Sequence, residues 1–542
     1  MNAGAFTPKL ITALKEGYDR GKLRADLFAG LTVAIVALPL AMALGIASGA
    51  GPSEGLVTAV VAGFLISALG GSRVQIGGPT GAFAVIVAGV IAAHGFDGLL
   101  LATFMAGIIL VIAGYAGVGR LMRFVPMPVV TGFTAGIAVI IATSQIGDFL
   151  GLRLDKVPAE FIAKLGAYGS ALGTLNWAAL GTGVATLAAI ILLRRYAPKL
   201  PAYLIAIVGA AIAAALLDLP LETVGDRFPV MPTGLPAPHV PHINLALLRD
   251  VMPSAFVIAF LAGIEALLSA VVADAMTGRR HRSGQELVGM GAANMASAAF
   301  GGLPATGAIA RTATNIRAGG VTPIAGISHA FFLLLFMVAA GGWLRYIPMA
   351  SLAAILLMVA WGMSEADRFV ALLRTDPSER ALLVLTFLLT VLVDLTVAIG
   401  VGVTLAALLF MRRMSEHAGL VAIDAEEMPE LRDKLPPGVE VFRFAGPLFF
   451  GVASEMLEAL RRMGQRPVHI ILRMEQVPYV DATGANALAT FVRQAGHGGT
   501  SVWLCGLQKQ PQEFLAKSEP RYAGAHRVGS WATALKRVSP RP

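Results

Sequence analysis

The chain has 542 residues, of which 56% are hydrophobic and only 14% charged, whereas ordinary globular domains are about 25% charged. Residues 1–413 hold 47 charged residues and the much shorter 414–542 hold 28. This excludes a single soluble globule, a disordered chain and a fibrous repeat, and predicts a polytopic membrane domain followed by a soluble domain. The formal net charge is +9, but the basic residues form short clusters between apolar segments, so no nucleic-acid partner is expected. The single cysteine, Cys505, excludes a disulfide framework and a cysteine-based zinc site.

Twelve apolar segments are long enough to span or nearly span a membrane, which takes roughly 20 residues. Two shorter segments, 80–93 and 307–318, begin at Gly- and Pro-containing breaks, and short half-helices are tolerated where they line a cavity. The sequence therefore predicts fourteen segments, at 28–48, 53–70, 80–93, 98–117, 129–150, 174–193, 201–217, 252–276, 285–300, 307–318, 323–342, 348–362, 380–393 and 395–411.

The distribution of Lys and Arg predicts the orientation of these segments. If the N-terminus is cytoplasmic, the segments on the inside hold 20 Lys and Arg residues and the outside loops hold 6. Because cytoplasmic loops of membrane proteins are enriched in these residues, both termini are expected to be cytoplasmic. The predicted location is the inner (cytoplasmic) membrane.

An internal repeat relates the two short segments. The sequence Ser67-Ala-Leu-Gly-Gly, then Gly78-Pro-Thr-Gly-Ala, returns as Ser297-Ala-Ala-Phe-Gly-Gly, then Pro304-Ala-Thr-Gly-Ala. The two copies lie seven segments apart, and an odd number gives the two halves opposite orientations. Broken helices at matching places in inverted halves indicate the substrate site of a transporter.

A half-helix that begins inside the membrane directs its unsatisfied N–H groups and the positive end of its dipole at the cavity. Two such helix starts predict an anion site, and the glycines near them let a ligand approach the backbone closely. Thr80 and Thr306 lie at these starts, where a hydroxyl serves either as a ligand or as a helix N-cap.

Two charged residues lie within the predicted membrane segments. Arg311 is one turn into the second half-helix, where it provides positive charge for an anion or pairs with a carboxylate. Glu265 has no charged neighbour within eight residues on either side, and such a carboxyl group can bind and release a proton. Ser269 is four residues further along the same helix face, so this pair could hold a proton or a sodium ion, or form a locked hydrogen bond.

Several of these motifs resemble the sulfate-permease (SulP) family of anion transporters, which includes the bicarbonate transporter of cyanobacteria. The resemblance covers nearly the whole chain. It rests on Leu38-Pro39, on Gly78-Pro79, on the run from Glu265 through Ala273-Asp274, Thr277-Gly278 and Gln285-Glu286-Leu287, and most specifically on 301–315, Gly-Gly-Leu-Pro-Ala-Thr-Gly-Ala-Ile-Ala-Arg-Thr-Ala-Thr-Asn.

The resemblance implies a fold of seven-plus-seven inverted repeats, shared with uracil permeases, in which a core bundle carries the site and moves against a gate bundle like an elevator. It implies homodimers, and coupling through Glu265 and Ser269. Leu40 and Ala310 depart from a Gln and a Ser that many animal members carry, which leaves more of the binding to backbone N–H groups. The implied anion-binding residues are Thr80, Gly81, Ala82, Gly307, Ala308, Ile309, Ala310 and Arg311.

The periodicity changes near residue 438. Alternating strands at 439–444, 468–473 and 501–507, with helices at 454–462 and 484–494, predict an α/β domain. It resembles a STAS domain, the module of anti-sigma-factor antagonists, and Thr483 falls where those proteins carry a phosphorylated residue. The favoured interpretation is that Thr483 caps the following helix; regulation through it or through a cytoplasmic protein partner is the alternative. The expected domains are 1–27 (cytoplasmic segment), 28–413 (transport), 414–437 (linker) and 438–542 (STAS).

Together these features predict a secondary transporter for a small anion, sulfate first, by proton symport. Bicarbonate and C4-dicarboxylates are close rivals as substrates, and sodium is the rival coupling ion. An anion exchanger or channel-like conductor, in which Glu265 is only structural, is a second class. A membrane-anchored sensor is a third. No ATP-binding loop, metal cluster or nucleophile triad is found in the sequence, so neither an enzyme nor a cofactor is expected.

Overall fold

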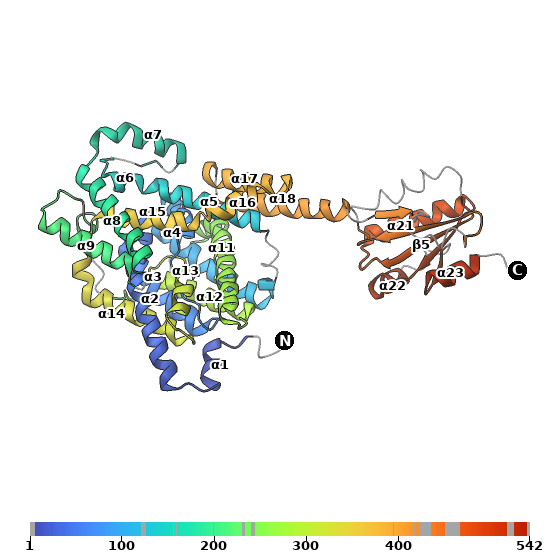
Figure 1. Ribbon diagram of the computed structural model, residues 1–542, viewed down its shortest axis with the longest axis horizontal. Helices are drawn as coiled ribbons and strands as arrows, with labels where there is room; N and C mark the ends of the chain where they lie inside the picture. The colour runs from blue at the N-terminus through green and yellow to red at the C-terminus, as the bar shows by residue number, and fades with distance from the viewer. Residues whose placement is uncertain are drawn as a thin grey trace. The chain divides into compact units, whose positions relative to one another are not determined.

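The computed structural model describes residues 6–120, 126–154, 157–158, 160–198, 200–229, 234–239, 244–393, 395–416, 419–422, 435–449, 467–517 and 525–538. The chain forms two compact units, Met1–Val403 and Thr404–Pro542. The first is helical, and the second contains a sheet covered by helices (Figure 1).

Helices account for nearly all of the first unit, and α18 runs on into the second. Within the described residues, nine helical spans are long and apolar enough to cross a membrane, which confirms a polytopic helical membrane protein. A helix occupies each of the fourteen predicted ranges, but a count of fourteen spans in a seven-plus-seven repeat stays a prediction. The helices are α1 (Lys9–Lys15), α2 (Arg20–Ala47), α3 (Pro52–Leu69), α4 (Gly81–Tyr115), α5 (Met127–Ser144), α6 (Ile146–Leu150), α7 (Phe161–Ala171), α8 (Trp177–Tyr196), α9 (Ala202–Leu216), α10 (Val224–Arg227), α11 (Leu245–Thr277), α12 (Ser283–Ala299), α13 (Ile309–Arg317), α14 (Ile324–Leu344), α15 (Met349–Met363), α16 (Ala366–Leu373), α17 (Pro377–Leu392) and α18 (Leu395–Glu416).

Helix α4 contains the break that the sequence places between 80–93 and 98–117. Gly95 has φ +71° and ψ −177°, a conformation outside the helical region that glycine adopts without strain. The helix therefore consists of two pieces, and its first piece begins directly after Pro79 and Thr80.

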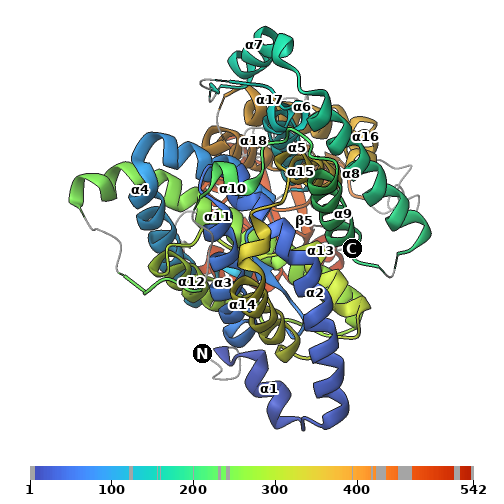
Figure 2. The same ribbon diagram turned by 90° about the vertical axis from the view of Figure 1, so that its left-hand side faces the viewer.

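The helices of the first unit pack into two bundles (Figure 2). The core bundle is defined as α2, α3, α4, α11, α12, α13 and α14, and the gate bundle as α5, α6, α8, α9, α15 and α17. Helix α12 lies along α4 and α3, and α14 along α2 and α3, whereas α15 packs on α5, α6 and α8. Glycines make the close approach possible: a Cβ on Gly107 of α4 would lie 2.7 Å from the carbonyl oxygen of Gly291 on α12.

The second unit is an α/β domain, as the sequence predicts. Its sheet has the order β3-β4-β5-β6-β7, with β3 antiparallel to β4 and the other neighbours parallel. Alternate residues pack on opposite faces: Phe442 and Leu472 belong to one apolar cluster, and Val441 and Ile471 to another. The predicted helix 454–462 lies outside the described residues. The elements are β3 (Gly419–Ala422), β4 (Val439–Ala445), β5 (His469–Gln476), β6 (Ser501–Cys505), β7 (Ala525–Val528), α21 (Ala482–His497), α22 (Lys509–Ala516) and α23 (Trp531–Val538).

Candidate functional site

The two sequence breaks meet in the core bundle as a short antiparallel ribbon. Strand β1 (Gly77–Gly78) pairs with β2 (Thr306–Gly307), with Gly77 opposite Gly307 and Gly78 opposite Thr306. A side chain at Gly307 would require the buried Gln75 to move, because the new Cβ would lie 1.6 Å from Nε2 of Gln75. Each strand leads within a few residues into a helix, β1 into α4 and β2 into α13. The structure thus brings together the two half-helix starts that the repeat predicts.

Neither helix start is capped by a side chain. The N-cap residues are Thr80 for α4 and Ala308 for α13, and neither provides a capping hydrogen bond. The first N–H groups of a helix have no intrahelical partner, so both starts present backbone donors and a positive dipole end. The alternative that Thr80 serves as an N-cap side chain is wrong. The hydroxyl of Thr306 is also engaged elsewhere, because it donates to the carbonyl oxygen of Ala262, 2.8 Å away.

Glu265 is joined to the first of these helix starts. The Thr80 hydroxyl donates to Oε2 of Glu265 over 3.0 Å, which links α11 to the start of α4 across 185 residues of chain. Ser269 does not contact Glu265 by any hydrogen bond between described residues. Its hydroxyl lies 3.2 Å from that of Thr312 on α13, and Thr312 in turn accepts the N–H of Ile76. Glu265 and Ser269 thus share a helix but bind different partners.

Arg311 lies against the buried side of the β1–β2 ribbon, next to Gly78. Its side chain is 3% exposed, and Nη2 donates to the carbonyl oxygen of Pro79 over 2.8 Å. No carboxylate pairs with it in the described part of the chain, where Nε and Nη1 have no hydrogen-bond partner. The peptide after Pro79 is trans, so its carbonyl and the N–H of Thr80 point in opposite directions. Because Arg311 holds the carbonyl, it turns the N–H of Thr80 away from the buried side.

The predicted site residues therefore divide into an accessible and a buried set. Ile309 and Ala310 are exposed on the first turn of α13, and Thr80, Glu265 and Ala308 are partly exposed. Gly81, Ala82, Gly307 and Arg311 are buried. The accessible surface thus combines two helix starts, one hydroxyl and one carboxyl group, with a positive charge behind them.

Sequence reasoning missed the side chains that hold the ribbon in place. On α12, Asn294 donates to the carbonyl oxygen of Ala305 over 2.9 Å and accepts the N–H of Ala305 over 2.8 Å. On α3, the Thr58 hydroxyl accepts the N–H of Leu303 over 2.6 Å. Asn315 donates to the carbonyl oxygen of Val74. The available signal was a polar side chain within an apolar membrane segment, which is rarely without a function.

In the second unit, Thr483 does not cap α21. The cap is Asp481, whose carboxylate accepts the N–H of Gly484 over 2.7 Å, so the interpretation of Thr483 as the cap is wrong. Thr483 is exposed on the first turn of the helix.

The chain matches two known protein families and is similar to several known proteins. Residues 23–386 match the Sulfate permease family, and residues 431–519 match the STAS domain. The chain is 41% identical over 505 residues to the "Putative sulfate transporter YvdB" of Bacillus subtilis, covering 93% of this chain and 95% of that protein. It is 31% identical over 516 residues to the "Bicarbonate transporter BicA" of Picosynechococcus, covering 91% and 90%.

The fold has counterparts among solved structures. The murine anion transporter Slc26a9 aligns over 99% of this chain and 95% of that one with a TM-score of 0.88, at 17% sequence identity. At that identity the likeness concerns the fold alone.

Proposed function

The chain belongs to the sulfate permease family, and we propose that it is a secondary active transporter that carries a small anion, sulfate first, across the cytoplasmic membrane. The observation that carries the proposal is the pair of uncapped helix starts at the β1–β2 ribbon, with the buried charge of Arg311 behind them. Backbone N–H groups and helix dipoles favour an anion without any lysine. The names of the relatives support sulfate first and bicarbonate second.

Glu265 would couple this binding to a proton. Its carboxylate is one hydrogen bond away from Thr80, the residue that starts α4. An ionised Glu265 repels an anion bound at this helix start, and a proton on Glu265 removes the repulsion. Anion and proton then strengthen each other's binding, which favours the state that carries both. A sodium ion beside Glu265 would act in the same way and is the alternative coupling ion.

The remaining expectations belong to the same proposal. The core bundle moves against the gate bundle, the protein is a homodimer with both termini in the cytoplasm, and the STAS domain binds a cytoplasmic partner. A phosphate on Thr483 would lie at the N-terminus of α21, where negative charge is stabilised by roughly 0.3–1 kcal/mol.

Uptake into proteoliposomes tests the proposal. Purified protein is reconstituted, and labelled sulfate is offered under an inward proton gradient, with sodium present or absent and with unlabelled bicarbonate or fumarate as competitor. We expect the proton gradient to accelerate sulfate accumulation without sodium, and Glu265→Gln to abolish that acceleration. The matched control is Glu286→Gln, because Glu286 is a buried glutamate of the core bundle that accepts the N–H groups of Gly71 and Ser72 instead.

Each other outcome assigns a different function. Accumulation only with sodium transfers the coupling to that ion. Uptake that requires an anion inside the vesicle identifies an exchanger, and gradient-independent current identifies a conductor. Absence of sulfate uptake, with saturable uptake of bicarbonate or fumarate, rejects sulfate as the substrate.

A further inference from the structure

Three chain segments connect the core bundle with the gate bundle: 116–126, 217–244 and 345–348. The segment 217–244 leads into the start of α11. Gly119, in the first of these segments, lies near the other end of α11. A Cβ on Gly119 would lie 3.2 Å from the Cβ of Ser283, the first residue of α12, which follows α11 in the chain. The two bundles are therefore tied at both ends of α11, once by 116–126 and once by 217–244.

The connectors 217–244 and 345–348 bind each other through their backbones. The N–H of Val224 donates to the carbonyl oxygen of Ile347 over 2.8 Å, and the N–H of Gly225 donates to that of Arg345 over 2.9 Å. Met349 donates in the opposite direction, to the carbonyl oxygen of Glu222, 2.9 Å away. We call this pairing of 222–225 with 345–349 the stitch. It joins one connector that enters the core bundle to another that leaves it.

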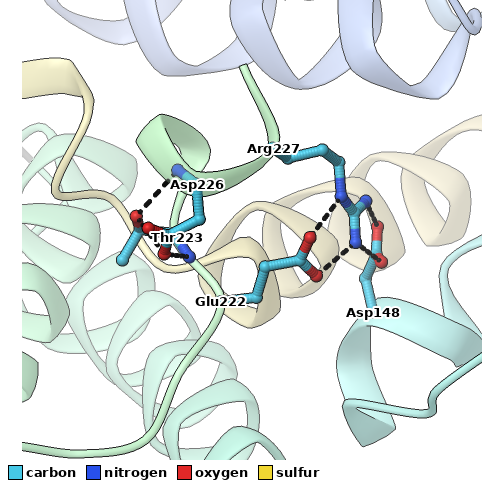
Figure 3. Close-up of polar contacts among 5 residues, drawn as sticks. All are labelled: Asp148, Glu222, Thr223, Asp226 and Arg227. Atoms are coloured by element: carbon cyan, nitrogen blue, oxygen red, sulfur yellow. Dashed lines mark hydrogen bonds and ion pairs between the residues drawn. The ribbon is translucent and has the colours of Figure 1, made fainter. Parts of the chain in front are cut away.

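An arginine fastens the stitch to the gate bundle (Figure 3). Arg227 donates from Nε and Nη2 to the carboxylate of Glu222, over 2.8 and 2.5 Å. It also donates from Nη1 and Nη2 to the carboxylate of Asp148 on α6, over 3.1 and 2.8 Å. Bidentate arginine–carboxylate pairs of this kind fix the orientation of the guanidinium group and also neutralise its charge. Beside them, Thr223 and Asp226 form a reciprocal capping box that starts α10.

We propose that the stitch stays closed throughout transport and is the pivot about which the core bundle moves. This rests on the proposed function, because it requires the two bundles to move relative to each other. Helix α14 ends at Leu344, and the next residue, Arg345, already lies in the stitch, so this end of α14 has no slack. The end of α14 therefore stays in place while the rest of the core bundle swings.

A disulfide across the stitch tests the proposal. The only cysteine, Cys505, is replaced by serine, and the pair Gly225→Cys and Arg345→Cys is introduced. A Cβ on Gly225 would lie 2.8 Å from the Cβ of Arg345. The two Cβ atoms therefore have to move apart by only about 1 Å to reach the roughly 3.8 Å that separates them in a disulfide. Each single-cysteine protein, treated with the same oxidant, is the control.

We expect oxidised double-cysteine protein to take up labelled sulfate as fast as the single-cysteine controls. Loss of uptake on oxidation, restored by a reductant, would show that the stitch opens and would overturn the proposal. Failure of the untreated protein and of both controls to take up sulfate would count against the proposed function instead.

Hydrogen exchange provides a measurement that is independent of transport. Arg227→Met should accelerate amide exchange in the peptide 219–228 by about fivefold, the upper range for loss of a partly exposed ion pair. The matched control is Arg249→Met, because Arg249 is exposed and makes no ion pair among the described residues. Equal exchange in the two variants would overturn the role of Arg227 as the fastener.

Discussion

Replacing Gly78 with alanine should weaken anion binding by moving Arg311. Gly78 has φ +150°, a conformation that disfavours side chains, and its Cβ would lie 2.3 Å from Nη1 of Arg311. The guanidinium group has to retreat by roughly 1 Å to reach van der Waals distance. Its 2.8 Å hydrogen bond to the carbonyl oxygen of Pro79 would then break, and the Thr80 N–H would lose its fixed direction.

The size of the effect follows from this contact. A hydrogen bond to a charged group contributes about 1.5–3 kcal/mol. Because about 1.4 kcal/mol corresponds to a factor of ten in affinity, Gly78→Ala should raise the KM for sulfate about 10- to 100-fold. The matched control is Gly89→Ala on α4, the helix that follows β1, because a Cβ there meets nothing within 4 Å.

Initial rates of sulfate uptake at a fixed proton gradient provide the assay, and size-exclusion profiles and Tm values show whether both variants fold. Gly89→Ala should retain the wild-type KM. A folded Gly78→Ala protein with the wild-type KM would refute the role assigned to Arg311 and its bond to Pro79.

Three further substitutions separate structural from coupling roles. Thr80→Val removes the hydrogen bond to Glu265 but no helix cap, so proton-driven accumulation should fall about tenfold, with a Tm loss no larger than that of Ser269→Ala; a Tm loss with normal accumulation would contradict this. Ser269→Ala removes only the contact with Thr312, so it should lower the Tm and leave the acceleration by protons intact, as paired uptake and melting measurements would show. Tyr18 precedes α2, and its hydroxyl donates to the carboxylate of Asp26 over 3.1 Å. Burial raises the pKa of this phenol in the folded protein above the value of about 10 that it has in the unfolded chain. The phenol therefore stabilises the fold fully below pH 10, and this stabilisation is lost as the pH rises above 10. The Tm should therefore fall less steeply between pH 8 and 11 for Tyr18→Phe than for wild type. An equal fall in both proteins would show that the phenol does not contribute to the pH dependence of stability.

The sequence predicts where the chain crosses the membrane and where it breaks, because both depend on local composition. Apolar runs need a certain length, and Gly and Pro interrupt helices wherever they fall. The repeated words at 78–82 and 304–308 indicate that both breaks matter, and they meet as β1 and β2. The alternation of β4 and β5 likewise follows from which side chains are apolar.

Partners of polar side chains could not be predicted in the same way. Thr80 and Glu265 are 185 residues apart, and which hydroxyl faces which carboxylate depends on how α4 packs on α11. Ser269 shares a helix face with Glu265 in the sequence pattern, yet the packing of α13 gives it Thr312 instead. The stitch was hidden for the same reason, because residues 222–227 resemble an ordinary polar loop until their partners at 345–349 are known.

Proton movement during sulfate uptake tests the central claim most directly. Proteoliposomes that contain a trapped pH-sensitive dye are given sulfate outside, without sodium and without an imposed gradient. Wild-type protein should acidify the lumen as sulfate enters, and Glu265→Gln should admit sulfate down its concentration gradient without acidification. Sulfate uptake by the wild type with no change in internal pH would contradict the assignment of Glu265 as the proton carrier.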